Sequence, residues 1–183
     1  MKKIYLVLTH TGTMLSRIIK VYTKNEFSHS SISLDDKLMK MYSFGRLNPN
    51  NPFIGGFVHE YIDKGTFKRF KNTTTKVYEL NISDEQYDKI QEIINKLETH
   101  KSEYKFNVLG LFLVALKFRY KREKSFYCAE FVKYVLQEIG VEDELPKLIK
   151  PEDFKRIKNK ELVYSGLLRD YKYNNVNEVE YAR

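Results

Sequence analysis

The sequence predicts a single α+β domain in which an antiparallel sheet packs against helices. Strand patterns crowd the first half of the chain, helical periods dominate the second half, and no linker or internal repeat separates the two. A chain of 183 residues is long enough for one domain with its own core. Its hydrophobic content of 42%, with 14 tyrosines and 12 phenylalanines, excludes a disordered or low-complexity protein. Residues 1–183 are therefore expected to form one domain.

The first half of the chain carries five short segments rich in β-branched and aromatic residues. Asp35 and Asp36 separate the second segment from the third and predict a hairpin turn. Apolar residues at positions 15, 18, 19 and 22 have helical spacing, and the Pro and Asn residues between Gly45 and Gly56 predict a loop at the rim of the sheet. The expected strands are Lys3–Leu8, Ser30–Leu34, Leu38–Phe44, Gly56–Ile62 and Lys76–Leu80.

The second half changes to the helical period. Ser83 and Gln86 form a capping-box pattern that predicts the start of a helix running to about His100. The stretch from Phe106 to Phe118 is apolar almost all round, which is typical of a core helix. Further expected elements are a helix from Cys128 that ends at Gly140, a short helix at Pro151–Phe154 and a returning strand at Glu161–Leu168.

Cysteine usage and the apolar runs bear on the compartment. Cys128 is the one cysteine, which excludes an intramolecular disulfide framework, a zinc ribbon and an iron–sulfur cluster, and fits a reducing compartment. The run Ile4–Leu8 is shorter than the roughly 7–15 apolar residues of a secretory signal. The run Leu109–Leu116 is likewise shorter than the roughly 20 residues of a membrane span. We therefore expect a cytoplasmic protein without a transmembrane segment.

Cys128 is the first candidate for chemistry because it falls in the first turn of an amphipathic helix. Backbone N–H groups there have no intrahelical partner and the helix dipole favours negative charge, so a thiolate is stabilised. The same N–H groups could receive an oxyanion. A small buried hydrophobe would occupy the same position on the apolar stripe, and position alone also fits that interpretation.

A thiol nucleophile needs a base, and the chain has four histidines. His29 begins a predicted strand, where its ring projects from the edge of the sheet, and is the leading candidate. His10 ends the first strand and is the second candidate. His59 lies within a strand and His100 ends a charged helix, where each is most simply structural. Cys128, His29 and His10 lack the close spacing of a zinc site, so neither a metal nor a cofactor is expected.

Three segments together resemble a known superfamily. They are Phe27-Ser-His-Ser-Ser-Ile-Ser-Leu-Asp35, Met41-Tyr-Ser-Phe-Gly-Arg46 and Phe126-Tyr-Cys-Ala-Glu-Phe-Val132. In this order, with histidine before cysteine, they resemble the circularly permuted branch of the NlpC/P60 papain-like superfamily. That branch includes YiiX/YebB-like bacterial proteins and, more remotely, lecithin:retinol acyltransferase-like enzymes. The resemblance spans roughly residues 3 to 155 and implies a papain-like antiparallel sheet with cysteine at a helix N-terminus.

The resemblance also implies catalytic roles. Cys128 matches the nucleophile and His29 the general base. The family's third polar group comes from the next strand and is often Glu, Gln or His; at that position this chain has Ser43. A serine hydroxyl can accept the ring N–H of His29 but cannot stabilise an imidazolium as a carboxylate does, which implies lower activity or another orienting group.

The implied reaction is acyl transfer or hydrolysis at an amide or ester, with a small peptide of the peptidoglycan type or a lipid-like acyl group as substrate. Arg46 follows Ser43 and could bind a carboxylate or phosphate of that substrate, although an ordinary surface arginine would look the same. A catalytically weak binding protein on the same fold remains an alternative, because of Ser43. So does a basic anion-binding or membrane-surface module, because the net charge is +8 and basic residues cluster at 117–124. No specific nucleic-acid partner is expected.

Overall fold

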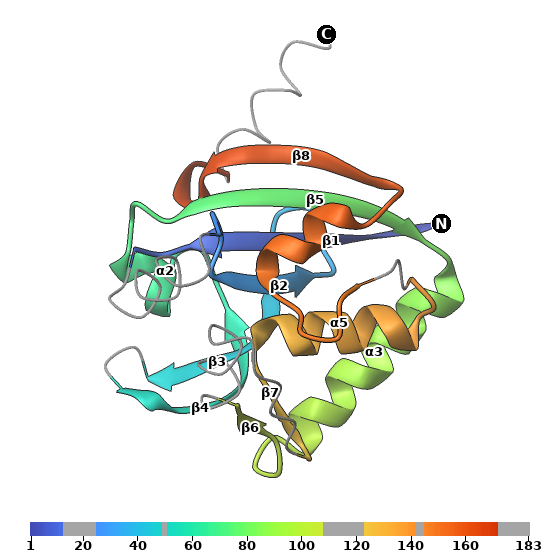
Figure 1. Ribbon diagram of the computed structural model, residues 1–183, viewed down its shortest axis with the longest axis horizontal. Helices are drawn as coiled ribbons and strands as arrows, with labels where there is room; N and C mark the ends of the chain where they lie inside the picture. Colours follow the sequence, from blue (N-terminus) through green and yellow to red (C-terminus); the bar gives the residue numbers. More distant parts are fainter. Residues whose placement is uncertain (13–24, 49–50, 108–122, 142–144, 172–183) are drawn as a thin grey trace, which may run out of the picture.

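A six-stranded antiparallel sheet forms the centre of the α+β fold, as expected (Figure 1). The computed structural model describes residues 1–12, 25–48, 51–107, 123–141 and 145–171. Strand β1, six consecutive residues of which are buried, lies in the middle of the sheet between β2 and β5. In sheet order the strands are β4 (Asn51–Glu60), β3 (Met41–Asn48), β2 (His29–Ser33), β1 (Lys2–His10), β5 (Thr74–Ile82) and β8 (Lys160–Leu167).

The segment between Gly45 and Gly56 corrects one prediction. The expected loop there is wrong, because β3 and β4 continue as a paired hairpin in which Gly45 faces Gly56 and Asn48 faces Asn51. Strand β4 is at the edge of the sheet, where a proline costs no ladder hydrogen bond on its open side. Gly55 allows a close approach, since a Cβ atom there would lie 2.4 Å from the Gly45 carbonyl oxygen.

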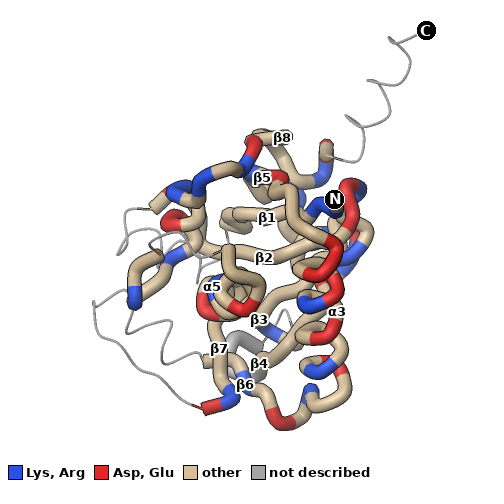
Figure 2. Tube along the Cα trace, turned by 90° about the vertical axis from the view of Figure 1, so that its right-hand side faces the viewer, with Lys and Arg blue, Asp and Glu red and all other residues tan. Residues whose placement is uncertain are grey.

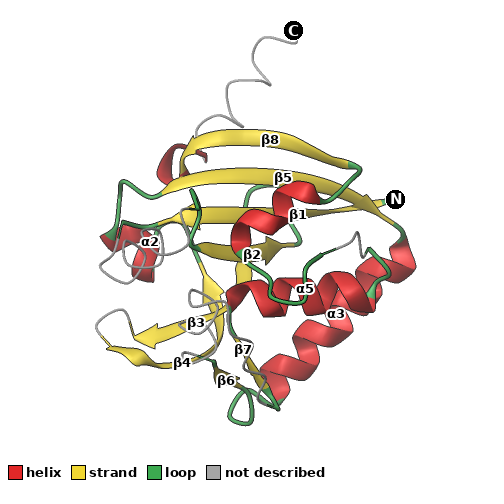
Figure 3. Cartoon of the chain, in the orientation of Figure 1, coloured by secondary structure: helices red, strands yellow, loops and turns green. Residues whose placement is uncertain are grey.

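Two helices cover one face of the sheet (Figure 3). Helix α3 (Asp84–Thr99) begins with the expected capping box: the Gln86 N–H donates to Ser83 Oγ at 3.2 Å, and the Ser83 N–H donates to Gln86 Oε1 at 2.9 Å. The Gln86 side chain also donates to the carbonyl of Ile139, just after helix α5 (Cys128–Glu138). That bond ties the start of α3 to the end of α5, and the apolar stripes of both helices enter one core with the sheet.

The opposite face of the sheet is covered by a smaller core. Helix α2 (Gly65–Arg69), which the sequence patterns did not predict, buries Phe67 there. The 3₁₀ segment Leu168–Asp170 and the following Tyr171 pack against the same face. The short helix expected at Pro151 is a 3₁₀ helix, Pro151–Arg156. Figure 2 shows α5 end-on beside β2 and β3, on the other side of the sheet from this second core.

A two-stranded parallel ladder leads into α5. Strand β6 (Lys105–Phe106) pairs with β7 (Ser125–Phe126), and only Tyr127 separates β7 from the helix. The prediction of a helix over Phe106–Phe118 is therefore wrong at its first residue, because Phe106 lies in β6. Residues 108–118 lie outside the described residues. The helix expected at 15–22 and most of the basic segment 117–124 also lie outside them. Among the residues that the structure describes, no helix is long and apolar enough to cross a membrane.

Candidate active site

Cys128 is the first residue of α5, where the sequence placed it. The preceding residue is held on both sides: the Tyr127 N–H donates to Glu130 Oε2 at 3.2 Å, and the Tyr127 hydroxyl donates to the Ile149 carbonyl at 2.9 Å. One turn into the helix, the buried Phe131 ring lies 5.5 Å from the Phe44 ring. These contacts fix the N-terminal turn of α5 against the sheet, and with it the position of the thiol.

The surroundings of the thiol suit a nucleophile that is shielded from solvent. Cys128 is 2% exposed, and it belongs to the large core. The N–H groups of the first helical turn have no carbonyl partner within the helix and carry its positive dipole end, so they favour a thiolate and a developing oxyanion. A buried thiolate still requires a counter-charge, because an unpaired charge away from water is costly.

His29 supplies the cationic group. It is the first residue of β2 and faces Thr9 of β1 in the ladder. The residue before it is tied to the same strand, since the Ser28 N–H donates to the Thr9 carbonyl at 3.1 Å. One residue earlier, the Phe27 N–H donates to Glu152 of the 3₁₀ helix at 3.2 Å. His29 therefore projects from a backbone that is anchored on two sides.

A carboxylate holds the ring of His29. Its Nε2 atom lies 2.9 Å from Glu60 Oε1 and 3.0 Å from Glu60 Oε2, and the two side chains are 19% and 15% exposed. Ser31, on the same face of β2, donates its hydroxyl to Glu60 Oε2 at 2.5 Å. Glu60 is the last residue of β4, so β2 and the edge strand meet at this pair.

The His29 ring is biased toward its protonated form. Burial of the ring by itself lowers the pKa of His29, but the charge of Glu60 and then the charge and hydrogen bond of Cys128 hold that pKa well above its ordinary value of 6.5. Because His29 Nε2 contacts the Glu60 carboxylate, Nδ1 is the ring nitrogen that can contact the Cys128 thiol. Cys128, His29 and Glu60 thus form one connected set of a thiol, an imidazole and a carboxylate.

Gly45 makes room for this set. A Cβ atom there would lie 3.8 Å from His29 Cε1 and 4.0 Å from Glu60 Oε1, which is ordinary contact. Any side chain longer than that of alanine would extend into the space beside the ring and the carboxylate. A glycine in the middle of β3 therefore leaves the histidine and glutamate side chains free to meet across the strand between them.

Ser43 does not occupy the position that the sequence predicted for it. Its side chain is fully buried, and its hydroxyl donates to the Ser30 carbonyl at 2.8 Å. The ring of His29 is held by Glu60 instead. Ser43 and Glu60 share a face of the β3–β4 hairpin, since Ser43 pairs with Val58 and side chains alternate along β4. The choice of Ser43 assumed that the orienting group comes from the strand next to His29, whereas it comes from the strand beyond.

Glu60 was the residue that sequence reasoning missed. A signal was present, since Glu60 is a carboxylate in the expected strand Gly56–Ile62, two residues after a buried valine. Using it would have required the pairing of β4 with β3, which the loop expected at 45–56 left undefined. The register of this hairpin is what brings Glu60 to the same place as His29.

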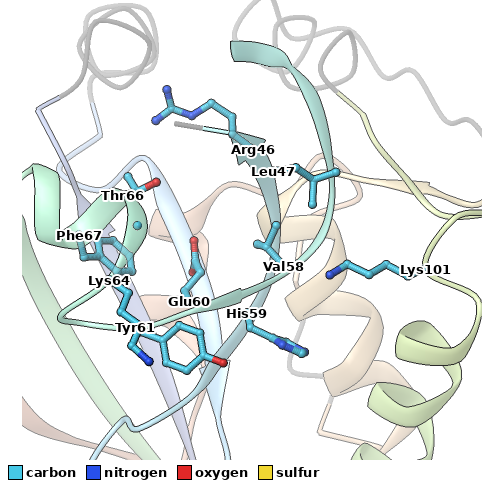
Figure 4. Close-up of a pocket in the computed structure, with 11 residues that line it drawn as sticks. Arg46, Leu47, Val58, His59, Glu60, Tyr61, Lys64, Thr66, Phe67 and Lys101 are labelled. Carbon is cyan, nitrogen blue, oxygen red and sulfur yellow. The ribbon is translucent and has the colours of Figure 1, made fainter. Parts of the chain in front are cut away.

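The Arg46 side chain borders the space beside Glu60. Its side chain lines a pocket of about 300 Å³ that Glu60 also lines (Figure 4). Burial and the like charge of Arg69 lower the pKa of Arg46, and the charge of Glu60 opposes that shift. A guanidinium and the orienting carboxylate therefore border the same pocket.

The other histidines have different partners. His10 Nδ1 lies 3.3 Å from Ser28 Oγ, and His100 Nδ1 lies 3.0 Å from the Lys96 carbonyl oxygen. His59 Nε2 lies 2.7 Å from Glu98 of α3, which forms a second histidine–carboxylate pair at the edge of the sheet. Cys128 helps to raise the pKa of His29, whereas burial and the charge of Lys40 lower the pKa of His59. In the described part of the chain, no group of three or more His, Cys, Asp or Glu residues could hold a metal ion.

Comparison of the chain with protein-family models and with curated proteins gives no match. Its activity must therefore be inferred from the residues and geometry of the site.

The His29–Glu60 pair predicts a stability difference that depends on pH. Because the folded-state pKa of His29 is raised, the pair's contribution is fully present below the unfolded pKa of about 6.5 and is lost as pH rises through the folded value. Glu60→Gln should therefore lower the free energy of unfolding by about 1.5–3 kcal/mol near pH 6, and by less near pH 9. Urea unfolding of both proteins across this range measures the difference.

Ser43→Ala is the matched control for that experiment. It removes one neutral hydrogen bond on the same hairpin, so its cost of about 1 kcal/mol should not change between the two pH values. A Glu60→Gln deficit that is equally constant would show that the histidine does not titrate against this carboxylate.

Proposed function

We propose that the protein is a cysteine-nucleophile hydrolase or acyltransferase of the permuted NlpC/P60 papain-like type, acting on an amide or ester. Cys128 is the nucleophile, His29 the general base and Glu60 the group that orients and charges the base. The observation that supports this most is the contact of His29 Nε2 with both oxygens of Glu60. Cys128 interacts with the same ring and raises the pKa of His29. These three side chains come from β4, β2 and α5, and together they supply what acyl transfer to a thiol requires.

The chemistry follows from these positions. The proton of the Cys128 thiol is held on His29 Nδ1 before the attack, and the thiolate sulfur then attacks the substrate carbonyl carbon. The carbonyl oxygen gains the negative charge, and the backbone N–H of Cys128 at the start of α5 helps to stabilise it. The His29 imidazolium then gives its proton to the departing amine or alcohol, which leaves a thioester on Cys128.

The thioester is resolved by the same base. His29 takes a proton from water, the resulting hydroxide attacks the thioester carbonyl, and the thiolate leaves as the acid is released. An amine or alcohol in place of water gives transfer instead of hydrolysis. Through both halves Glu60 holds the ring orientation and offsets the imidazolium charge, which a serine at the same place could not do.

The alternative of a decayed binding protein rested on Ser43 as a weak orienting group. In the proposal Glu60 provides a carboxylate in that role, which favours an enzyme over the decayed binding protein. The basic-module alternative depends mainly on a segment, 117–124, most of which lies outside the described residues.

The proposal predicts a covalent acyl-enzyme on Cys128. With 4-nitrophenyl acetate at neutral pH, the parent protein should release a burst of 4-nitrophenolate equal to the enzyme present, and peptide mass spectrometry should locate the acetyl group on Cys128. Since the chain has a single cysteine, Cys128→Ser should abolish the burst while retaining any background acetylation of lysines. A burst of the same size in both proteins, or acetylation confined to lysines, would contradict the proposal.

A further inference from the structure

The pocket beside Glu60 has a one-sided charge. It is formed at the edge of the sheet by residues of β3, β4, α2 and the turn after α3, and its volume is about 300 Å³. Among the residues that the structure describes, three cations line it, Arg46, Lys64 and Lys101, against one carboxylate, Glu60. Figure 4 shows the Arg46 guanidinium and the Thr66 hydroxyl on the side toward which the Glu60 carboxylate points.

The Glu60 carboxylate that lines the pocket is already engaged. Both oxygens of Glu60 contact the His29 ring, and one also accepts from Ser31. The negative charge of Glu60 thus serves the imidazolium, and the lining keeps an excess of positive charge. Arg46 is half-buried with Arg69 in electrostatic reach, an arrangement in which a bound negative charge is favoured.

We infer that this pocket binds an oxyanion, a carboxylate or a phosphate monoester, carried by the ligand of the site. Arg46 provides the planar donor fork that suits either group, Lys101 adds a point charge from the far wall, and the Thr66 hydroxyl offers a further donor. This inference deepens the proposed function, because it gives the acyl substrate an acidic group held next to the orienting carboxylate.

The size of the pocket limits what enters. About 300 Å³ is at the lower end of the range for small-molecule sites, which suits one acidic group with a few attached atoms rather than an extended chain. The lining mixes these cations with the apolar side chains of Leu47, Val58 and Phe67. A short acidic substituent with some apolar surface therefore matches the pocket better than a bare inorganic ion.

The test measures binding without catalysis. In Cys128→Ser protein at constant ionic strength, inorganic phosphate and acetate are titrated separately while the arginine Nε–Hε signals are followed by NMR. The Arg46 signal should shift and saturate with at least one of the two anions, and Arg46→Met should weaken that binding at least tenfold. Arg156→Met is the matched control, because Arg156 has an exposed side chain and does not line the pocket.

Each outcome decides something. Saturation with phosphate alone identifies a phosphorylated ligand, saturation with acetate alone a carboxylate ligand, and saturation with both a site that recognises charge. Absence of saturation with either anion, or equal weakening by Arg46→Met and Arg156→Met, overturns the inference. The binding test uses the Cys128→Ser protein, so its result does not depend on the thiol. If an anion binds there but the parent protein forms no acyl-enzyme, the proposed function is refuted and the pocket assignment stands.

Discussion

Iodoacetamide should alkylate Cys128 at pH 6.5 on the order of 10²-fold faster in the parent protein than in His29→Gln. In the parent, the protonated His29 ring offers the thiolate a counter-charge inside a shielded site. Glutamine keeps a polar side chain of similar size but carries no charge, so the buried sulfur stays a thiol.

The alkylation rate of Glu60→Gln should lie between those of the parent and His29→Gln, on the order of tenfold below that of the parent. The ring remains next to the sulfur, but the main charge that keeps His29 protonated is removed. The alkylation is quenched at set times, and intact-protein mass spectrometry of the samples gives all three rates. Because Cys128 is the only cysteine in the sequence, each cysteine adduct is assigned to it.

Because each substitution replaces a residue other than Cys128 with one of similar size, the ratios are expected to report electrostatics rather than access to the sulfur. The Ser43→Ala protein is the control for disturbance of the hairpin and should react like the parent. Equal rates in the parent and His29→Gln would mean that Cys128 is an inert core cysteine. That result would favour a binding protein over an enzyme.

Phe131→Ala should lower the free energy of unfolding by about 3–5 kcal/mol, the largest stability change that we expect. Phe131 is fully buried on α5, and its ring lies 5.5 Å from Phe44 and 5.7 Å from Phe57. These three rings join the helix that carries Cys128 to the hairpin that carries Glu60. Truncation leaves a cavity at that junction, in addition to the lost burial.

Urea or thermal unfolding measures this loss, and Leu162→Ala is the control. Leu162 is 49% exposed on the edge strand β8, so its truncation should change the stability by less than about 0.5 kcal/mol. Similar losses for the two variants would show that the aromatic cluster does not carry the packing of α5 on the sheet.

Local patterns predicted many elements of this protein. The Ser83–Gln86 capping box, the apolar stripe after Cys128 and the strand that begins at His29 all depend on residues within a few positions of one another. Hydrogen bonds within a helical turn and the two-residue alternation of a strand are short-range, so the sequence determines them directly. By the same reasoning it placed Cys128 at a helix N-terminus and His29 at the start of a strand, although that strand lies inside the sheet and not at its edge.

The tertiary structure decided which residues meet in the site. Glu60 is 31 residues from His29 and reaches it because β3 and β4 pair in one register, with Gly45 leaving space between them. A slip of one residue would turn Glu60 to the other face of the sheet and leave Ser43 nearer the role predicted for it. Register is set by the packing of the whole sheet, and so are the pocket around Arg46 and the meeting of His29 with Cys128. The sequence by itself determined which groups could react, and the fold decided which of them meet.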